Sequence, residues 1–89
     1  MASPRVEIRY CTQCKFLLRA AWLAQELLST FENELAEVIL APSKGGIFEV
    51  SLDDELIFSN KEAGRFPEAR EIKEGIRDKV DPQRMIGHR

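Results

Sequence analysis

The sequence has few of the residues that metal sites and hydrolytic active sites require. Its 89 residues include two cysteines, Cys11 and Cys14, and a single histidine, His88. A structural zinc site needs four ligands, so zinc would have to be shared between two chains. A hydrolase is not supported, because no Ser-His-Asp set is evident and a histidine near the chain end is a poor candidate base. We therefore expect no metal site within one chain, and a zinc site between two chains stays open as an alternative.

The sequence also contains no block of like charges and no long apolar run. Thirteen basic and 15 acidic residues give a net charge of -2, with the two signs interspersed. A nucleic-acid surface normally shows clustered basic residues, and a membrane span needs roughly 20 apolar residues. The N-terminus does not have the charged-then-apolar order of a signal peptide. We therefore expect a cytoplasmic protein with no nucleic-acid or membrane partner, in which two closely spaced cysteines indicate redox chemistry or metal binding.

The pattern of apolar residues predicts one domain of four strands and two helices. Its core is expected at about residues 5–80, with residues 81–89 as a flexible tail. The expected strands are Val6–Tyr10, Glu37–Ala41, Ile47–Leu52 and Glu55–Ser59, with a turn over residues 42–46 and a tight hairpin turn at Asp53 and Asp54. The expected helices run from Lys15 to about Thr30 and from Pro67, at the first helical position, to about Val80, and Asn60–Phe66 is expected to be a loop.

The order β-α-β-β-β-α predicts a small α/β protein. A strand, helix, strand unit normally connects two parallel strands, and a hairpin adds antiparallel ones. The prediction is a thioredoxin-like fold: a four-stranded mixed sheet with both helices on one face. The side chains expected to face these helices are Val6, Ile8, Tyr10, Val38, Leu40, Phe48, Val50, Leu52, Leu56 and Phe58, and Ile39, Ile47 and Ile57 are expected on the open face.

The two cysteines are separated by two residues and lie where the first strand gives way to the first helix. A helix N-terminus stabilises a thiolate, so Cys11 is expected to have a pKa below the free value of about 8.5. Cys14 follows one turn later, within reach of a disulfide, and Lys15 and Arg19 add positive charge nearby. The pattern predicts a thiol redox centre at Cys11 and Cys14. The alternative is a pair of reduced cysteines that only pack.

Three segments of the chain together resemble a known family. They are VEIRYCTQCKFLLRAAWLAQELL, GGIFEVSLDDELIFSNK and FPEAREIKEGIRD. The family is that of the selenoprotein W-like (Rdx-type) proteins, which includes selenoproteins T, H and V, and this chain resembles a cysteine-containing member of bacterial type. The resemblance covers about Val6–Val80. It implies a thioredoxin-like fold and a thiol redox role with glutathione as a possible co-substrate and no tightly bound cofactor.

The resemblance and the position in the chain favour different attacking thiols. In the selenium-containing members selenocysteine occupies the second position of the motif, which is Cys14 here. The expected helix N-terminus favours Cys11 instead. Which cysteine attacks therefore stays open.

Further candidate site residues surround the thiols in the predicted fold. Thr12 and Gln13 lie between the cysteines and are neutral, and Lys15 follows them. Gly45 and Gly46 precede the third strand, where true thioredoxins carry a cis-proline. Glycine allows close backbone approach to a ligand, although these two residues could equally serve only a turn.

Two apolar residues of the first helix lie outside its expected core face. That face is a continuous arc formed by Leu23, Phe16, Leu27, Ala20, Phe31, Ala24, Leu17, Leu28 and Ala21. Leu18 and Trp22 lie one turn apart on the otherwise polar face and close to the thiols. An exposed tryptophan there suits the docking of a protein partner. The alternative is that Met85 and Ile86 cover both residues.

Two functional hypotheses follow from these patterns. In the first, the protein is a thiol-disulfide redox protein that cycles Cys11 and Cys14 with glutathione or protein thiols. In the second, it is a redox-sensitive protein-interaction module without efficient turnover, in which Trp22 and the open sheet face bind a partner and thiol oxidation switches that binding.

Overall fold

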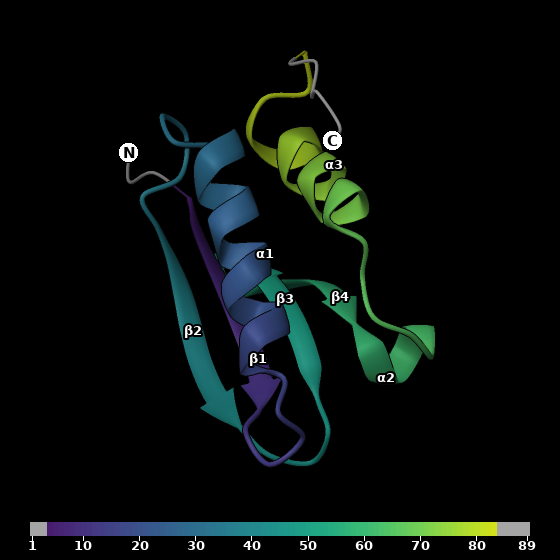
Figure 1. Ribbon diagram of the computed structural model, residues 1–89. Coiled ribbons are helices and arrows are strands. Elements are labelled where there is room, and N and C mark those ends of the chain that lie inside the picture. The colour runs from purple at the N-terminus through teal and green to yellow at the C-terminus, as the bar shows by residue number, and fades with distance from the viewer. Residues whose placement is uncertain (1–3, 84–89) are drawn as a thin grey trace.

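The protein is seen here as a computed structural model, in which residues 4–83 are described. Its elements are β1 (Arg5–Cys11), α1 (Leu17–Thr30), β2 (Glu37–Ser43), β3 (Phe48–Leu52), β4 (Glu55–Ser59), α2 (Asn60–Ala63) and α3 (Ala69–Val80) (Figure 1). Apart from the short α2, this is the predicted order, and the small thioredoxin-like α/β fold is confirmed. The expected cover of Trp22 by Met85 and Ile86 falls outside the described residues, as do His88 and most of the expected tail.

The four strands form one mixed sheet in the order β2-β1-β3-β4. β1 pairs with β2 in parallel, so that Val6 lies opposite Val38 and Ile8 opposite Leu40. A parallel pair needs a crossover, which α1 supplies. β3 pairs in antiparallel fashion with both β1 and β4. The strand that ends at Cys11 is therefore paired on both sides.

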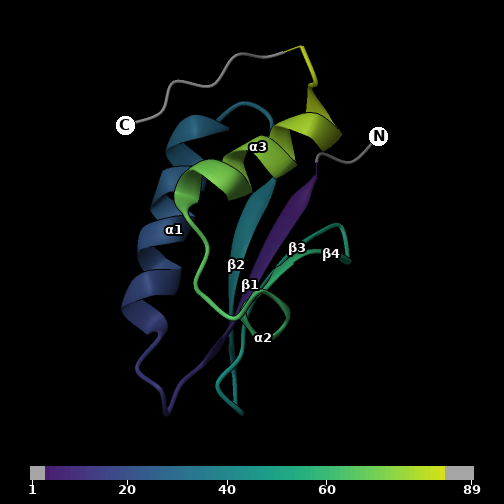
Figure 2. The same cartoon turned by 90° about the vertical axis from the view of Figure 1, so that its right-hand side faces the viewer.

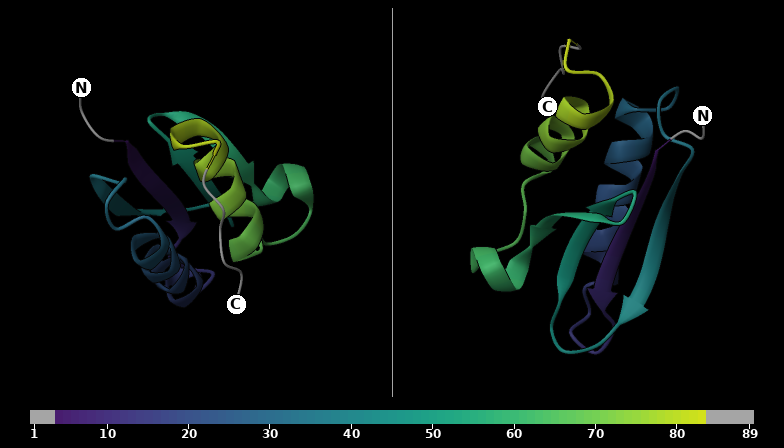
Figure 3. Two further views of the ribbon diagram at one scale, coloured as in Figure 1. Left: turned by 90° about the horizontal axis from the view of Figure 1, so that it is seen from above. Right: turned by 180° about the vertical axis from the view of Figure 1, so that it is seen from behind.

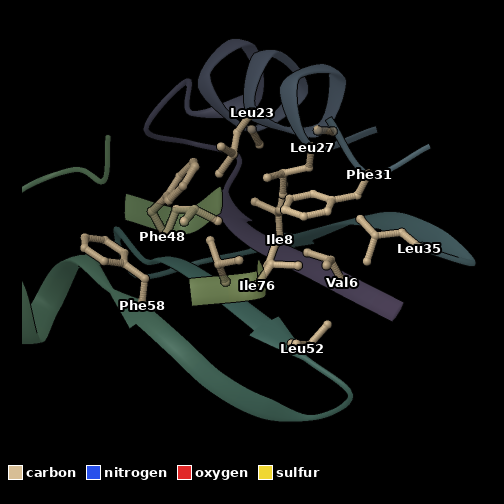
Figure 4. Packing of buried hydrophobic residues seen from close by; sticks show 14 of the residues in the cluster. Val6, Ile8, Leu23, Leu27, Phe31, Leu35, Phe48, Leu52, Phe58 and Ile76 are labelled. Carbon is tan, nitrogen blue, oxygen red and sulfur yellow. The ribbon is translucent and has the colours of Figure 1, made fainter. Parts of the chain in front are cut away.

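The core lies between the sheet and the two longer helices. α1 and α3 cover the same face of the sheet (Figure 2), whereas in the described part of the chain no helix covers the opposite face (Figure 3, right). Figure 4 shows side chains from α1, β1 and α3 meeting between the layers. The buried apolar cluster consists of Val6, Ile8, Tyr10, Ala20, Leu23, Ala24, Leu27, Phe31, Leu35, Phe48, Val50, Leu52, Phe58, Ile72 and Ile76. Most of the side chains predicted to face the helices are therefore buried as expected.

A β-bulge in β4 makes the predicted facing of Leu56 and Ile57 wrong. Val50 pairs with Phe58, but the next residue, Ser51, pairs with Leu56, so Ile57 is an extra residue in its strand. Leu56 is consequently 44% exposed, while Ile57 packs against the core. An inserted residue reverses the alternation of side chains, and the bulge could not be inferred from the period-two pattern alone.

Apolar residues at the margins of the layers are more exposed than predicted. Leu40 was expected in the core but is 36% exposed. It lies on the edge strand β2, whose Val38 is only partly buried. Leu17 and Leu28 lie at the border of the apolar arc of α1 and are also exposed. The core therefore contains fewer side chains than the apolar arc of α1 and the alternation along the strands predicted.

The predicted start of the first helix at Lys15 is wrong. Lys15 has a φ of 63°, in the left-handed region that an α-helix cannot contain. Its N–H donates to the carbonyl of Thr12 at 3.1 Å and closes a turn over residues 12–15. The helix begins only at Leu17, with Phe16 as its N-cap residue.

The second strand continues through the expected turn as far as Ser43, and the third begins at Phe48 rather than Ile47. Pro42 is tolerated within β2 because β2 is an edge strand, where a missing N–H removes no required ladder bond. The hairpin turn at Asp53 and Asp54 is as predicted. Both residues have positive φ, 49° and 69°, as a two-residue turn of type I′ requires.

The segment expected to be a loop, Asn60–Phe66, contains the short helix α2. Ser59 caps its start by accepting a hydrogen bond from the N–H of Glu62, and Gly64 ends it with a φ of 72°. This helix lies close to the end of the sheet that carries the cysteines.

The last helix begins at Ala69, two residues after the expected first position at Pro67. Glu68 is its N-cap residue and forms a capping box with Glu71, in which each side chain accepts from the other residue's backbone N–H. The two acidic residues therefore cap the helix directly. Within residues 4–83, no helix is long and apolar enough to cross a membrane.

Candidate functional site

The two cysteines lie at one end of the sheet but in different surroundings. Cys11 is the last residue of β1, its N–H donates to the carbonyl of Ile47 at 2.9 Å, and its side chain is only 1% exposed. Cys14 lies in the following turn and is exposed. The expected position of Cys11 at a helix N-terminus is wrong, because residues 12–16 separate it from Leu17. The helix dipole, which acts within the first turn, cannot account for its ionisation.

Hydrogen bonds at the sulfur take the place of the helix dipole. The pKa of Cys11 is lowered mainly by a hydrogen bond from the side chain of Cys14, against the opposing effect of burial. The backbone N–H groups of Gly46, Cys14 and Gln13 lower it further. The pKa of Cys14 is raised, mainly because its thiol is held by the same bond to Cys11, and burial adds to this. Of the two thiols, Cys11 is therefore the one that loses its proton first, and the remaining proton stays on Cys14.

Of the two candidate glycines, the structure brings only Gly46 to the thiols. Both have positive φ, 77° for Gly45 and 72° for Gly46. A Cβ atom on Gly46 would lie 3.9 Å from Cys14 Sγ and 3.2 Å from Lys61 Nζ, whereas one on Gly45 would meet nothing within 4 Å. Gly45 serves the turn, and Gly46 forms one wall of the site.

Two polar side chains hold the backbone around the thiols in place. Asn60, the first residue of α2, accepts from the N–H of Phe48 at 2.7 Å and donates to the carbonyl of Gly46 at 2.9 Å. Thr12 donates to the carbonyl of Ser43 with its N–H at 3.1 Å and with Oγ1 at 3.4 Å. These bonds fix Gly46 and the cysteine turn to the end of the sheet.

The structure adds Lys61 to the site, a residue that the sequence pattern did not single out. Its positive charge acts on Cys14 and lowers the pKa of that thiol, opposing the larger effects of Cys11 and burial. The positive charge near the thiols was expected from Lys15 and Arg19. The guanidinium of Arg19 lies over the ring of Phe66, 4.1 Å from its centroid. No signal in the sequence could have found Lys61, because it lies in a segment expected to be a loop.

Leu18 and Trp22, the candidate partner-binding residues, are 82% and 54% exposed. They line a groove of about 270 Å³ together with Arg19, Leu23, Phe48, Phe66 and Pro67. One of the lining residues, Phe48, is the first residue of β3, and its N–H donates to the side chain of Asn60, which also holds Gly46 beside the thiols. Phe66 and Pro67 were not expected in this surface.

Among residues 4–83, no three His, Cys, Asp or Glu side chains come together in a group that could hold a metal ion. His88, the further ligand considered for a zinc site shared between chains, lies outside this range.

Comparisons with known proteins agree with this architecture. The selenoprotein W-related protein of Vibrio cholerae is 45% identical, with a TM-score of 0.87 over 90% of this chain and 100% of that one. A protein of Bordetella parapertussis is 48% identical, with a TM-score of 0.86 over 89% of this chain and 100% of that one.

Two mammalian proteins are more distant relatives. Migration and invasion enhancer 1 from Bos taurus and from Mus musculus is in each case 32% identical, over 75 and 74 residues respectively, or 82% and 81% of this chain. The chain spans only 62% and 61% of the length of these relatives.

The model of the Rdx family matches residues 5–78, and this range contains every element from β1 to α2 and most of α3. Together with the structural matches, it accounts for the fold and for the close cysteine pair. The chain belongs to the Rdx family.

Proposed function

We propose that this protein is a thiol-disulfide redox protein that exchanges disulfides with glutathione or with protein thiols through Cys11 and Cys14. The observation that carries the proposal is the hydrogen-bonded pair of thiols, one buried at the end of β1 and one exposed in the adjoining turn. Rdx membership and the match to a selenoprotein W-related structure support it.

Access favours Cys14 as the attacking thiol. Exchange requires a sulfur to approach the partner disulfide along the axis of its S–S bond, and the side chain of Cys11 is only 1% exposed. Cys14 can pass its proton to the Cys11 thiolate through the hydrogen bond that joins them, although this transfer is uphill, because the pKa of Cys11 is lowered and that of Cys14 is raised. In this mechanism Cys11 first acts as the base and then resolves the mixed disulfide.

With glutathione disulfide the steps balance as follows. The Cys14 thiolate attacks one sulfur, a mixed disulfide forms on Cys14, and one glutathione leaves as a thiolate. Cys11 then gives up its proton to the first glutathione thiolate and attacks the Cys14 sulfur, which forms the Cys11–Cys14 disulfide and releases the second glutathione as a thiolate. Two protein thiols are oxidised and one glutathione disulfide is reduced to two glutathione molecules. The reverse sequence reduces the protein.

The test is a glutathione redox titration with alkylation of free thiols and intact-mass detection. The wild type is expected to pass in one two-electron transition from two free thiols to none. Cys11→Ser is expected to stop at a stable glutathione adduct, and Cys14→Ser to form almost none. Full exchange activity in the double serine variant would overturn the redox function, whereas an adduct in Cys14→Ser would overturn only the assignment of the attacking thiol.

The groove favours a second candidate, a protein-interaction module in which thiol oxidation controls binding of an apolar protein segment. Trp22 lines the groove and is the only tryptophan of the chain, so its fluorescence reports on this surface. If oxidation changes the groove, the emission of the reduced and oxidised forms should differ. Identical emission spectra would count against this candidate.

A further inference from the structure

Lys61 is a cation beside the thiols that forms no salt bridge with a carboxylate of residues 4–83. Lys73 and Lys79 pair there with Glu26 and Glu55, at 2.9 Å and 2.7 Å. Lys61 has no such partner and its residue is exposed. Its Nζ and Cys14 Sγ both lie within 4 Å of the point that a Cβ on Gly46 would occupy. A free positive charge therefore stands next to the exposed sulfur.

The fold determines where this charge lies. Lys61 directly follows Asn60, whose side-chain amide donates to the carbonyl of Gly46 and accepts from the N–H of Phe48. Ser59 caps the same short helix. The absence of a side chain at Gly46 leaves open the space that separates the ammonium from the sulfur. Lys61, Gly46 and Cys14 thus form three sides of one small site.

We propose that Lys61 is a positioning residue which selects disulfides that carry a net negative charge, as glutathione disulfide does. This inference deepens the redox function proposed above and rests on it. The partner sulfur has to meet Cys14 Sγ, so the groups next to that sulfur come close to the ammonium of Lys61. A carboxylate there is attracted, and an ammonium is repelled.

The same charge acts on the attacking thiol. The groups that face Cys14 are the Cys11 thiol from β1, the backbone of Gly46 and the ammonium of Lys61 from α2. Lys61 lowers the pKa of Cys14 while Cys11 raises it, so the lysine also favours transfer of the proton to Cys11. This second effect is the same for every disulfide, and a comparison between disulfides separates it from selection by charge.

The experiment measures how fast the reduced full chain is oxidised by three disulfides: glutathione disulfide, which is anionic, hydroxyethyl disulfide, which is neutral, and cystamine, which is cationic. The variants are Lys61→Gln, Lys61→Arg and Lys79→Gln. The last removes the same charge from a different helix, α3, and is the matched control. The readout is the ratio of the glutathione disulfide rate to the cystamine rate. The free energy of unfolding of each variant is measured first, because an unfolded chain exposes both thiols to every disulfide.

Lys61→Gln is expected to lower this ratio about tenfold, because the rate with glutathione disulfide falls roughly threefold and the rate with cystamine rises roughly threefold. The rate with the neutral disulfide should change less than either. Lys61→Arg and Lys79→Gln should keep the wild-type ratio, and added salt should lower it in the wild type. An unchanged ratio in Lys61→Gln overturns this inference alone. A wild type that reacts with none of the three disulfides overturns the proposed redox function and this inference with it.

Discussion

Replacing Gly46 by alanine tests the site with Gly45→Ala as an internal control. Both glycines have a left-handed backbone, so an alanine at either position costs about 1 kcal/mol of unfolding free energy. For a domain of this size that corresponds to a melting temperature lower by roughly 4–8 °C. Only the Cβ at position 46 would meet Lys61 Nζ at 3.2 Å and Cys14 Sγ at 3.9 Å. The end of the lysine can shift by a few tenths of an ångström, so the two variants should be about equally stable.

Their activities should nevertheless differ. The new methyl group occupies the space between the ammonium and the exposed sulfur, so Gly46→Ala should exchange with glutathione disulfide about tenfold more slowly than the wild type. Gly45→Ala should keep the wild-type rate, because its Cβ meets nothing. Urea unfolding gives the stabilities, and alkylation followed by mass spectrometry gives the rates. Equal exchange rates in the two variants would show that Gly46 does not form a wall of the site.

Three further predictions concern the thiol pair, the helix interface and the loop beside the thiols. Because the pKa of Cys11 is lowered, the reduced protein becomes more stable as pH rises towards the ordinary pKa of a thiol. Because the pKa of Cys14 is raised, the reduced protein becomes less stable as pH rises above that pKa. Urea unfolding of the reduced protein across pH should therefore show a maximum that the double serine variant lacks. Glu26→Ala should lower the free energy of unfolding by about 2 kcal/mol, because it leaves the buried ammonium of Lys73 unpaired. Lys73→Met should lower it by less, and thermal unfolding that ranks the two variants in the opposite order would contradict this. Asn60→Ala removes two partly buried hydrogen bonds, so it should lower the free energy of unfolding by about 2 kcal/mol and slow exchange with glutathione disulfide. A loss of stability with an unchanged exchange rate would mean that these bonds do not hold the site.

The fold could be predicted because its evidence is spread over many residues. Alternation along the strands and the apolar arc of the first helix each depend on several side chains that agree with one another. The features that were missed depend on single residues. Lys15 is not a glycine, so its left-handed φ is unmarked in the sequence, and the extra residue Ile57 looks like any other residue of an alternating strand.

The candidate site divides in the same way. The spacing of Cys11 and Cys14 is local, so the motif is visible in the sequence, and their role remains a prediction. The expected cause of the Cys11 acidity, a helix N-terminus, was wrong, because hydrogen bonds from a distant turn at Gly46 and from Cys14 act there instead. Lys61 is far from Cys14 along the chain and reaches it only through the folding of α2 beside the sheet. No local pattern could reveal that contact.

The position of the cysteine turn outside both β1 and α1 has a consequence for protein engineering. Thr12 and Gln13 are exposed, and Gln13 acts on the Cys11 sulfur with its backbone N–H rather than its side chain. A library randomised at these two positions should therefore yield variants that keep the fold but span a range of reduction potentials. Proline should be depleted at position 12, because the N–H of Thr12 is bonded to Ser43. The dipeptide between the thiols is thus a natural place to tune the couple without altering its scaffold.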